Sequence, residues 1–342
     1  MMVSNPDRFK LTETEHEEVY QAIEQDAFLD TTPSSAPQAI ILGGQPGAGK
    51  SGLLERSYRS FEGLNAVKIN GDDFRQWHLH RDAILEEDES AFAALTDPDV
   101  RPWTKRLFDT TIETKRNVIF EGTMRVKTDI SNTMDRLQQE GYSVKAQVIA
   151  AHERQSVVGI HLRYEWQKKT KGHGRMAPLE VHDQAYTGVL DTIDHIESNK
   201  LASKVELYNR NGVCVYENSL KDGEWDKLPR VRDALEAERN RPPSLDECHD
   251  HLADWKEVIG YMQDRGAASE DLQAVRGIAK GFIAEIHPTL AADQNPVTRA
   301  TTAASIQDIF GESVELAHAS EADISLTIKD PSKDRSDEFT PN

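Results

Sequence analysis

The segment that most constrains this chain is a glycine-rich run that ends in lysine and serine, Gly44-Gln45-Pro46-Gly47-Ala48-Gly49-Lys50-Ser51. It fits the pattern G-x-x-x-x-G-K-[ST], in which glycines let successive backbone N–H groups turn inward around a phosphate chain. An apolar segment precedes the run at 39–43, and a helical pattern follows it over 51–60. Because this order also aims the positive end of a helix at the loop, the run predicts a nucleotide-phosphate site.

The last two residues of the run have expected roles of their own. Lys50 offers a positive charge to the β- and γ-phosphates, and the hydroxyl of Ser51 is suited to ligate Mg2+. The expected phosphoryl donor is therefore ATP or GTP, held by residues 44–51 with Mg2+ as the cofactor. The alternative is a glycine-rich turn that binds nothing, which the strand–loop–helix context disfavours.

The composition of the chain limits which kinds of molecule it is expected to bind and in which compartment. The 342 residues carry a formal net charge of -19, so the chain is a poor candidate for binding nucleic acid through its phosphates. No apolar run approaches the roughly 18 residues of a membrane span, and residues 1–11 lack the apolar core of a signal peptide. Cys214 and Cys248 give no disulfide framework and fit a reducing compartment. We therefore expect a cytoplasmic protein with no nucleic-acid or membrane partner.

Short apolar segments that alternate with helical patterns predict the fold class. Segments at 38–43, 66–70, 117–121 and 143–150 are each followed by a helical pattern. This order predicts an α/β protein whose parallel sheet is flanked by helices, and together with the glycine-rich run it is typical of a P-loop NTPase or kinase core. Further elements are expected as helices at 12–29, 153–169 and 179–199, and as a hairpin of strands 204–208 and 213–216.

After the hairpin the pattern becomes helical only. Apolar residues recur on single helical faces, which predicts a small accessory helical domain. The expected helices are 229–240, 244–265, 270–286 and 300–310. The full predicted division is an N-terminal helix and linker over 1–37, a kinase domain over 38–228, an accessory helical region over 229–320 and a disordered tail over 321–342.

Carboxylates stand at the ends of the second and third expected strands. Asp72 and Asp73 follow the second strand, and the third ends at Glu121, with Thr123 and Arg125 close behind. Such strand ends lie on the ligand side of a parallel sheet. We expect Asp72 to act as general base toward a substrate hydroxyl, and Asp73 to cap the next helix or to stand beside it. Glu121, Thr123 and Arg125 are expected to bind the substrate, although each alone also fits a structural role.

Two arginines are expected to act on the transferred phosphoryl group. Arg163 lies on the helix before a glycine-containing loop at 170–178, and Arg175 lies within that loop. A mobile loop that carries an arginine can stabilise charge on a phosphoryl group. The alternative is a solvated basic loop, since lysines at 168, 169 and 171 make this the most basic stretch of the chain.

Two histidine clusters invite a metal interpretation, His78 and His80 with Asp82, and His249 and His251 with Cys248. Both lie in segments that look helical, where side chains two positions apart point in different directions. We therefore predict surface or packing roles for them.

Taken together, the ordered motifs resemble those of the zeta toxins, the kinase components of bacterial toxin–antitoxin systems. The likeness covers roughly residues 12–220. It rests on the segments 43–51, 70–78 and 120–125, on Arg163-Tyr164-Glu165 and Arg175, and on 207–213 followed by Tyr216.

The resemblance implies phosphorylation of a UDP-N-acetyl sugar by ATP or GTP, typically at the 3′-hydroxyl of UDP-N-acetylglucosamine. It assigns Asp72 as the base and places Lys50, Arg163 and Arg175 on the phosphates, with Ser51 on Mg2+. It places Glu121, Thr123 and Arg125 on the sugar-nucleotide side. It also implies an antitoxin partner that contacts residues 12–29.

Two departures keep other functions open. An acidic residue that contacts the sugar in the family would fall near Lys105, which favours a kinase of another hydroxylated substrate. The region after 229 has no counterpart in the minimal toxin and fits an antitoxin fused in cis, a partner-binding module or a delivery domain. A nucleotide-dependent interaction module is a further alternative, but such a module needs no base at Asp72.

Overall fold

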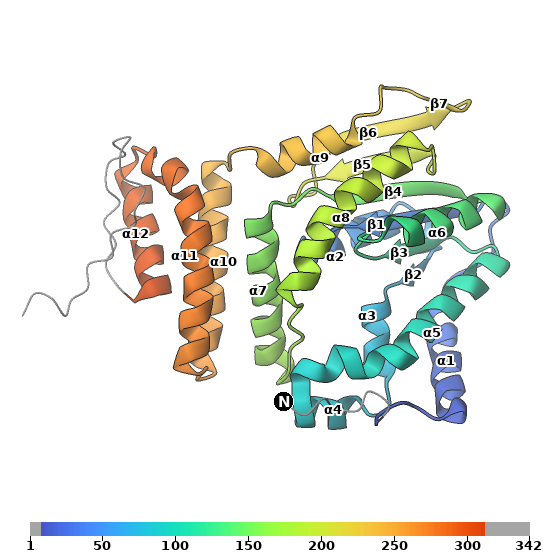
Figure 1. The fold of residues 1–342 in the computed structure, drawn as a ribbon, viewed down its shortest axis with the longest axis horizontal. Helices are drawn as coiled ribbons and strands as arrows, with labels where there is room; N and C mark the ends of the chain where they lie inside the picture. Colours follow the sequence, from blue (N-terminus) through green and yellow to red (C-terminus); the bar gives the residue numbers. More distant parts are fainter. Residues whose placement is uncertain (1–7, 312–342) are drawn as a thin grey trace, which may run out of the picture. The chain divides into compact units, whose positions relative to one another are not determined.

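The computed structural model describes residues 8–311 (Figure 1). The chain divides into two compact units at the peptide bond between Asn240 and Arg241. The first unit contains the glycine-rich run and all of the β-structure, and the second contains helices. Among the described residues, no helix is both long enough and apolar enough to cross a membrane.

The first unit is built on one seven-stranded sheet with the order β2-β3-β1-β4-β5-β6-β7. The pairs that join β2 to β5 are all parallel, and β6 and β7 add two antiparallel strands at one edge. The bounds are β1 Gln38–Gly43, β2 Val67–Ile69, β3 Val118–Glu121, β4 Ser143–Ile149, β5 Lys204–Tyr208, β6 Cys214–Lys221 and β7 Glu224–Trp225. The prediction of a parallel sheet is confirmed, and β1 is the middle one of the five parallel strands.

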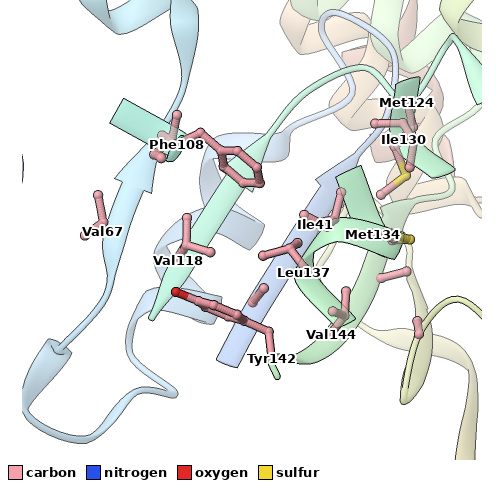
Figure 2. Packing of buried hydrophobic residues seen from close by; sticks show 14 of the residues in the cluster. Ile41, Val67, Phe108, Val118, Met124, Ile130, Met134, Leu137, Tyr142 and Val144 are labelled. Carbon is pink, nitrogen blue, oxygen red and sulfur yellow. The ribbon is translucent and has the colours of Figure 1, made fainter. Parts of the chain in front are cut away.

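Helices cover both faces of this sheet, because its central strands alternate apolar side chains between two cores. Ile41 of β1 belongs to the large core, whereas Ile40 belongs to a smaller core with side chains of α2 on the opposite face. Figure 2 shows Ile41, Val118 and Leu137 side by side in the large core. The helices of this unit are α1 Glu13–Phe28, α2 Lys50–Tyr58, α3 Gly71–Phe74, α4 Arg81–Asp88, α5 Phe92–Glu113, α6 Lys127–Gln139, α7 Glu153–Lys171, α8 Leu179–Ser198 and α9 Val231–Asn240.

The stretch between β2 and β3 had no predicted helix bounds, and it folds into α3, α4 and the long helix α5. Pro98 and Pro102 lie inside α5 and remove backbone donors, so its sequence pattern is weak. The helix is stabilised instead by burial of a large apolar face that includes Trp103, Leu107 and Ile112.

The described part of the second unit, residues 241–311, is a group of three helices, α10 Leu245–Asp264, α11 Ser269–Ala291 and α12 Pro296–Phe310. A capping box of Ser244 and Glu247 opens α10, which agrees with the predicted start of this helix at 244. Two details correct the prediction. α11 continues through Pro288, and the boundary between the units lies after 240 rather than at 229. α9 belongs to the first unit because Val231 and Leu235 are buried in its core. The predicted disordered tail at 321–342 lies outside the described residues.

Candidate functional site

The glycine-rich run forms a tight loop between β1 and α2. Its glycines at 44, 47 and 49 have φ angles of +146°, +77° and +98°, a region that disfavours side chains. A Cβ atom on Gly47 would lie 1.9 Å from the backbone oxygen of Ser156 in α7. The loop is therefore shaped by bare backbone, as a phosphate cradle requires.

One cleft of about 550 Å³ opens over this loop and the carboxyl ends of β2 and β3. It brings together seven side chains that the sequence singled out, which are Lys50, Ser51, Asp72, Glu121, Thr123, Arg163 and Arg175. Its other lining residues are Pro46, Asn70, Asp73, Arg75, Gln76, Arg81, Leu85, Phe92, Gly122, Gln167, Lys171, His173 and Gly174. The carboxyl ends of parallel strands account for this convergence.

Lys50 folds back onto its own loop. Its Nζ donates to the backbone oxygen of Gly44 at 2.9 Å and of Gln45 at 3.1 Å. Burial lowers the pKa of Lys50 to about 8, and the nearby Glu121 carboxylate works against that shift. A phosphate group in the cleft would add negative charge that favours the ammonium form of Lys50.

Asp72 is held by two arginines. Arg175 donates from both terminal nitrogens to the two carboxylate oxygens, with Nη1 2.6 Å from Oδ1, and Nε of Arg75 lies 3.2 Å from the same Oδ1. Burial raises the pKa of Asp72, but the two guanidinium groups outweigh it and hold the pKa below its usual range. Asp72 is therefore an ionised carboxylate, and arginine donors engage both of its oxygens.

The carboxylates around Asp72 have the opposite tendency. Burial raises the pKa of Glu121, although Lys50 works against the shift, and Asn70 Nδ2 lies 3.3 Å from Glu121 Oε2. Burial and the neighbouring Asp72 also raise the pKa of Asp73. The predicted capping role of Asp73 is wrong, because Asn70 is the N-cap of α3 and accepts from the backbone N–H of Asp72. Asp73 stands beside Asp72 and lines the cleft.

Arg163 reaches the cleft from α7 with spare hydrogen-bonding capacity. Its Nε and Nη2 atoms are buried and have no hydrogen-bond partner within the described residues 8–311. Burial lowers the pKa of Arg163, and the nearby Arg175 adds to the shift. Two orphaned donors beside Lys50 fit an anion that occupies the cleft.

Three predicted site residues do not contribute their side chains to the cleft, and one of them, Ala48, is fully buried in a small core. Arg125 is exposed and outside the lining, because Met124 takes a φ of +51° and turns into the core beside Ile130 (Figure 2). The side chain of Gln45 is fully buried and donates to the backbone oxygen of Ala151 at 2.9 Å. Gln45 thus anchors the loop instead of facing a ligand with its side chain.

The first histidine cluster departs from its predicted setting. His78 and His80 lie in the turn that precedes α4 rather than in a helix. His78 is buried, with Nε2 3.2 Å from Asp99 Oδ2, so it has a packing role. Over residues 8–311, no group of three or more His, Cys, Asp or Glu is arranged to hold a metal ion. Mg2+ needs no such group, because it is usually bound through one or two protein oxygens with phosphates and water.

Sequence reasoning missed the roles of two arginines, Arg75 and Arg239. Arg75 donates a hydrogen bond to the carboxylate of Asp72, and Arg239 of α9 donates one to the side chain of Gln45 in the loop. Arg75 stands three positions after Asp72, and that i,i+3 spacing was a usable signal. Nothing in the sequence brings Arg239 near residue 45, since 194 positions separate them.

Comparison with known proteins identifies the family of this chain. The sequence model of the Zeta toxin family matches residues 21–221, more than half of the chain. The chain belongs to the zeta toxin family. Members of this family are kinase-like phosphotransferases of toxin–antitoxin systems, so the resemblance drawn from the motifs is confirmed.

Curated relatives of this zeta toxin homologue include toxins from three bacterial species. It is 30% identical to Toxin zeta of Enterococcus hirae over 209 residues, which cover 60% of this chain and 70% of the relative. It is 29% identical to Toxin zeta of Streptococcus pyogenes over 234 residues, 67% of this chain and 79% of the relative. Toxin PezT of Streptococcus pneumoniae is 28% identical over 210 residues, 58% of this chain and 83% of the relative.

A solved structure supports the fold. A chain from the PezAT chromosomal toxin–antitoxin system of Streptococcus pneumoniae superposes with a TM-score of 0.65 at 23% sequence identity, over 74% of this chain and 99% of that one. At this identity the match shows that the two chains share a fold, and it does not show which reaction this chain catalyses.

Proposed function

We propose that this protein transfers the γ-phosphate of ATP or GTP to a hydroxyl of a UDP-N-acetyl sugar, the 3′-hydroxyl of UDP-N-acetylglucosamine, and thereby acts as a toxin. The observation that carries the proposal is the single cleft that contains both Lys50 of the phosphate loop and the carboxylate of Asp72. A donor phosphate and an acceptor hydroxyl that meet there need no further reactant. Membership of the zeta toxin family supports the phosphotransferase class and the toxin role.

Each group has a role in the proposed transfer. The loop N–H groups, Lys50 and Arg163 bind the donor phosphates, and Asp72 accepts the proton of the acceptor hydroxyl as its oxygen bonds to the γ-phosphorus. The bond from that phosphorus to the bridging oxygen breaks, and the nucleoside diphosphate leaves. Ser51 and Glu121 present oxygen ligands of the kind that Mg2+ prefers, and bound Mg2+ would neutralise charge on the phosphates. Arg175 stabilises the negative charge that develops on the transferred phosphoryl group.

The cleft also favours an acceptor that carries phosphates of its own. Besides the cations at the loop, Arg81, Lys171 and His173 line it and fit a second anionic group such as the diphosphate of a nucleotide sugar. Thr123 adds a hydroxyl for sugar contacts. Lys105 is outside the lining, has a 77% exposed side chain and pairs with Asp109, so this departure gives no argument against a sugar.

The test is a phosphotransfer assay with the purified full chain, Mg2+ and ATP or GTP against a panel of UDP-sugars, read by mass spectrometry. We expect UDP-N-acetylglucosamine to gain the mass of one phosphate, and Asp72→Asn to abolish the gain. Asp129→Asn, an exposed aspartate on α6, is the matched control and should stay active. Nucleotide binding without phosphorylation of any UDP-sugar would contradict the proposed acceptor and extend the panel to other hydroxyl compounds.

An antitoxin partner is part of the proposal. The family and the toxin–antitoxin system named for the superposed pneumococcal structure support it, and α1 is the proposed contact. Glu18, Gln21 and Gln25 are exposed on this helix. A pull-down from the native host should recover a small helical protein with the unaltered chain and less of it with Glu18→Lys and Gln25→Lys combined. Recovery of none would favour inhibition in cis by the second unit.

A further inference from the structure

The phosphate loop of this protein is anchored by an arginine from α9. The Arg239 side chain extends into the interior of the first unit, where the residue is 2% exposed, and its Nη2 donates to Oε1 of Gln45 at 3.1 Å. Gln45 is the second residue of the loop and is itself fully buried. Arg239 lies outside the segment 21–221 that matches the zeta toxin family. The contact therefore joins the glycine-rich run to a helix that the motif analysis did not connect with it.

Two residues, Gln45 and Tyr186, hold the terminal nitrogens and the plane of the guanidinium, whereas its buried Nε has no hydrogen-bond partner among residues 8–311. Its Nη1 donates to the backbone oxygen of Tyr186 at 2.7 Å, and its Cζ lies 3.8 Å from the centroid of the Tyr186 ring. Burial lowers the pKa of Arg239 to about 10, so the side chain keeps its charge at neutral pH. Burying a charged arginine costs free energy unless its donors find partners. Here the partners are Tyr186 of α8 and Gln45 of the loop.

Gln45 transmits this position to the loop backbone. Its Nε2 donates to the backbone oxygen of Ala151 at 2.9 Å and to Ser156 Oγ at 3.2 Å, so its Oε1 is left for Arg239. The next residues form the glycine cradle, and Lys50 Nζ binds the backbone oxygen of Gln45 itself. Without Arg239, Oε1 of Gln45 would be a buried acceptor without a donor, and the side chain would gain freedom to turn.

We infer that Arg239 is a positioning residue for the phosphate loop, which acts through Gln45 to keep the loop in its nucleotide-binding conformation. The inference rests on the proposed function only in that the loop binds a nucleotide. If loss of Arg239 leaves about one tenth of the molecules with a competent loop, the apparent Kd for ATP rises about tenfold. The KM for the acceptor and the kcat at saturating ATP stay close to their original values, because Arg239 does not line the cleft in which the acceptor would bind and react.

The experiment is an ATP-binding titration of the full chain, together with steady-state kinetics, for Arg239→Met and Arg239→Lys. Arg232→Met is the matched control, since Arg232 lies on the same helix and makes exposed pairs with Asp191 and Glu236. We expect about tenfold weaker ATP binding for Arg239→Met, a smaller loss for Arg239→Lys and no change for Arg232→Met. The lysine variant keeps the charge and tests the inference if the methionine variant fails to fold.

A double-mutant cycle separates positioning from general stability. If Arg239 acts through Gln45, Arg239→Met should cost much less ATP affinity in a Gln45→Ala background than in the unaltered chain. Additive losses, or Arg239 variants that bind ATP as tightly as the unaltered chain, would overturn the inference and leave the proposed kinase activity intact. An unaltered chain that binds no nucleotide would refute the proposed function and the inference together.

Discussion

The guanidinium of Arg175 and the carboxylate of Asp72 form a two-bond ion pair across the cleft, with Nη1 2.6 Å from Oδ1. One comes from the loop between α7 and α8 and the other from α3. In the proposed reaction they have different partners, since Asp72 receives a proton and Arg175 binds the transferred phosphoryl group. In the free protein Asp72 and Arg175 therefore bind each other, and this ion pair must open before either group can act in catalysis.

Loss of this pair should loosen the loop that carries Arg175. In Asp72→Asn we expect backbone amides at 172–177 to exchange hydrogen about two- to fivefold faster, because a partly exposed ion pair contributes modestly to local stability. Glu89 still binds Gly174 and Lys168, so the loop should stay folded. Hydrogen exchange read by mass spectrometry measures this, with Asp129→Asn as control. Equal protection in both variants would show that the pair does not hold the loop.

Arg75 should set the pH at which the base becomes protonated. Its side chain is 11% exposed and donates to Thr96 Oγ1 and to Asp97 Oδ1. In Arg75→Met, burial acts on Asp72 with one fewer cation to oppose it, so the pKa of Asp72 rises. A base must be ionised to act, so the acid limb of the kcat/KM profile should move up by about one pH unit.

Arg101→Met is the matched control for that profile. Arg101 binds the other carboxylate oxygen of Asp97 but is 76% exposed and lies outside the cleft lining. Its acid limb should not move, and Arg75→Lys should move less than Arg75→Met because the charge is kept. An unshifted limb in Arg75→Met would mean that Arg175 alone maintains the ionisation of Asp72.

The convergence of the cleft was predictable because it follows from topology. Parallel strands end at one edge of the sheet, so Asp72 and Glu121 had to approach the loop that follows β1. Arg125 shows where that argument stops. Its direction depends on the left-handed φ of Met124, and the sequence does not reveal that Met124, rather than Arg125, turns inward against β1.

The arginines that position other groups could not be predicted for a related reason. The hold of Arg75 on Asp72 depends on α5, a helix whose prolines obscure its pattern. The hold of Arg239 on Gln45 depends on how α9 docks on the first unit, which is a matter of long-range packing. Local patterns specify which residues can do chemistry, and tertiary packing decides which others keep them in place.

Nucleotide binding should take up a proton at alkaline pH. The pKa of Lys50 in the free protein is about 8, and at pH 9 most of the molecules carry it uncharged. Phosphates favour the charged form, so the bound pKa rises and binding brings in a proton. The Kd for ATP should increase up to about tenfold per pH unit above 8.

Calorimetric titration at pH 9 in two buffers of different ionisation enthalpy measures that uptake directly. Lys50→Arg is the control, because an arginine stays protonated throughout this range and removes the pH dependence even if affinity falls. Identical heats in both buffers with the unaltered chain would contradict the lowered pKa of Lys50.

Gly159 of α7 lies against the phosphate loop and should tolerate no side chain. A Cβ there would lie 2.4 Å from the backbone oxygen of Gly47 and 3.1 Å from Nη1 of Arg210, which itself donates to that oxygen. Backbone cannot yield as a flexible side chain would, so the loop must shift. We expect Gly159→Ala to destabilise the first unit by about 1–3 kcal/mol and to weaken ATP binding.

Gly52→Ala provides the comparison, since an added Cβ at that exposed helical position meets no atom within 4 Å. Replacing a helical glycine by alanine in open space should raise stability by about 0.5–1 kcal/mol. Thermal unfolding and ATP titration of both variants therefore give changes of opposite sign in stability. If Gly159→Ala melted and bound ATP like the unaltered chain, the loop would have to sit farther from α7 than these contacts place it, and the anchoring of Gln45 through Ser156 would lose its geometric basis.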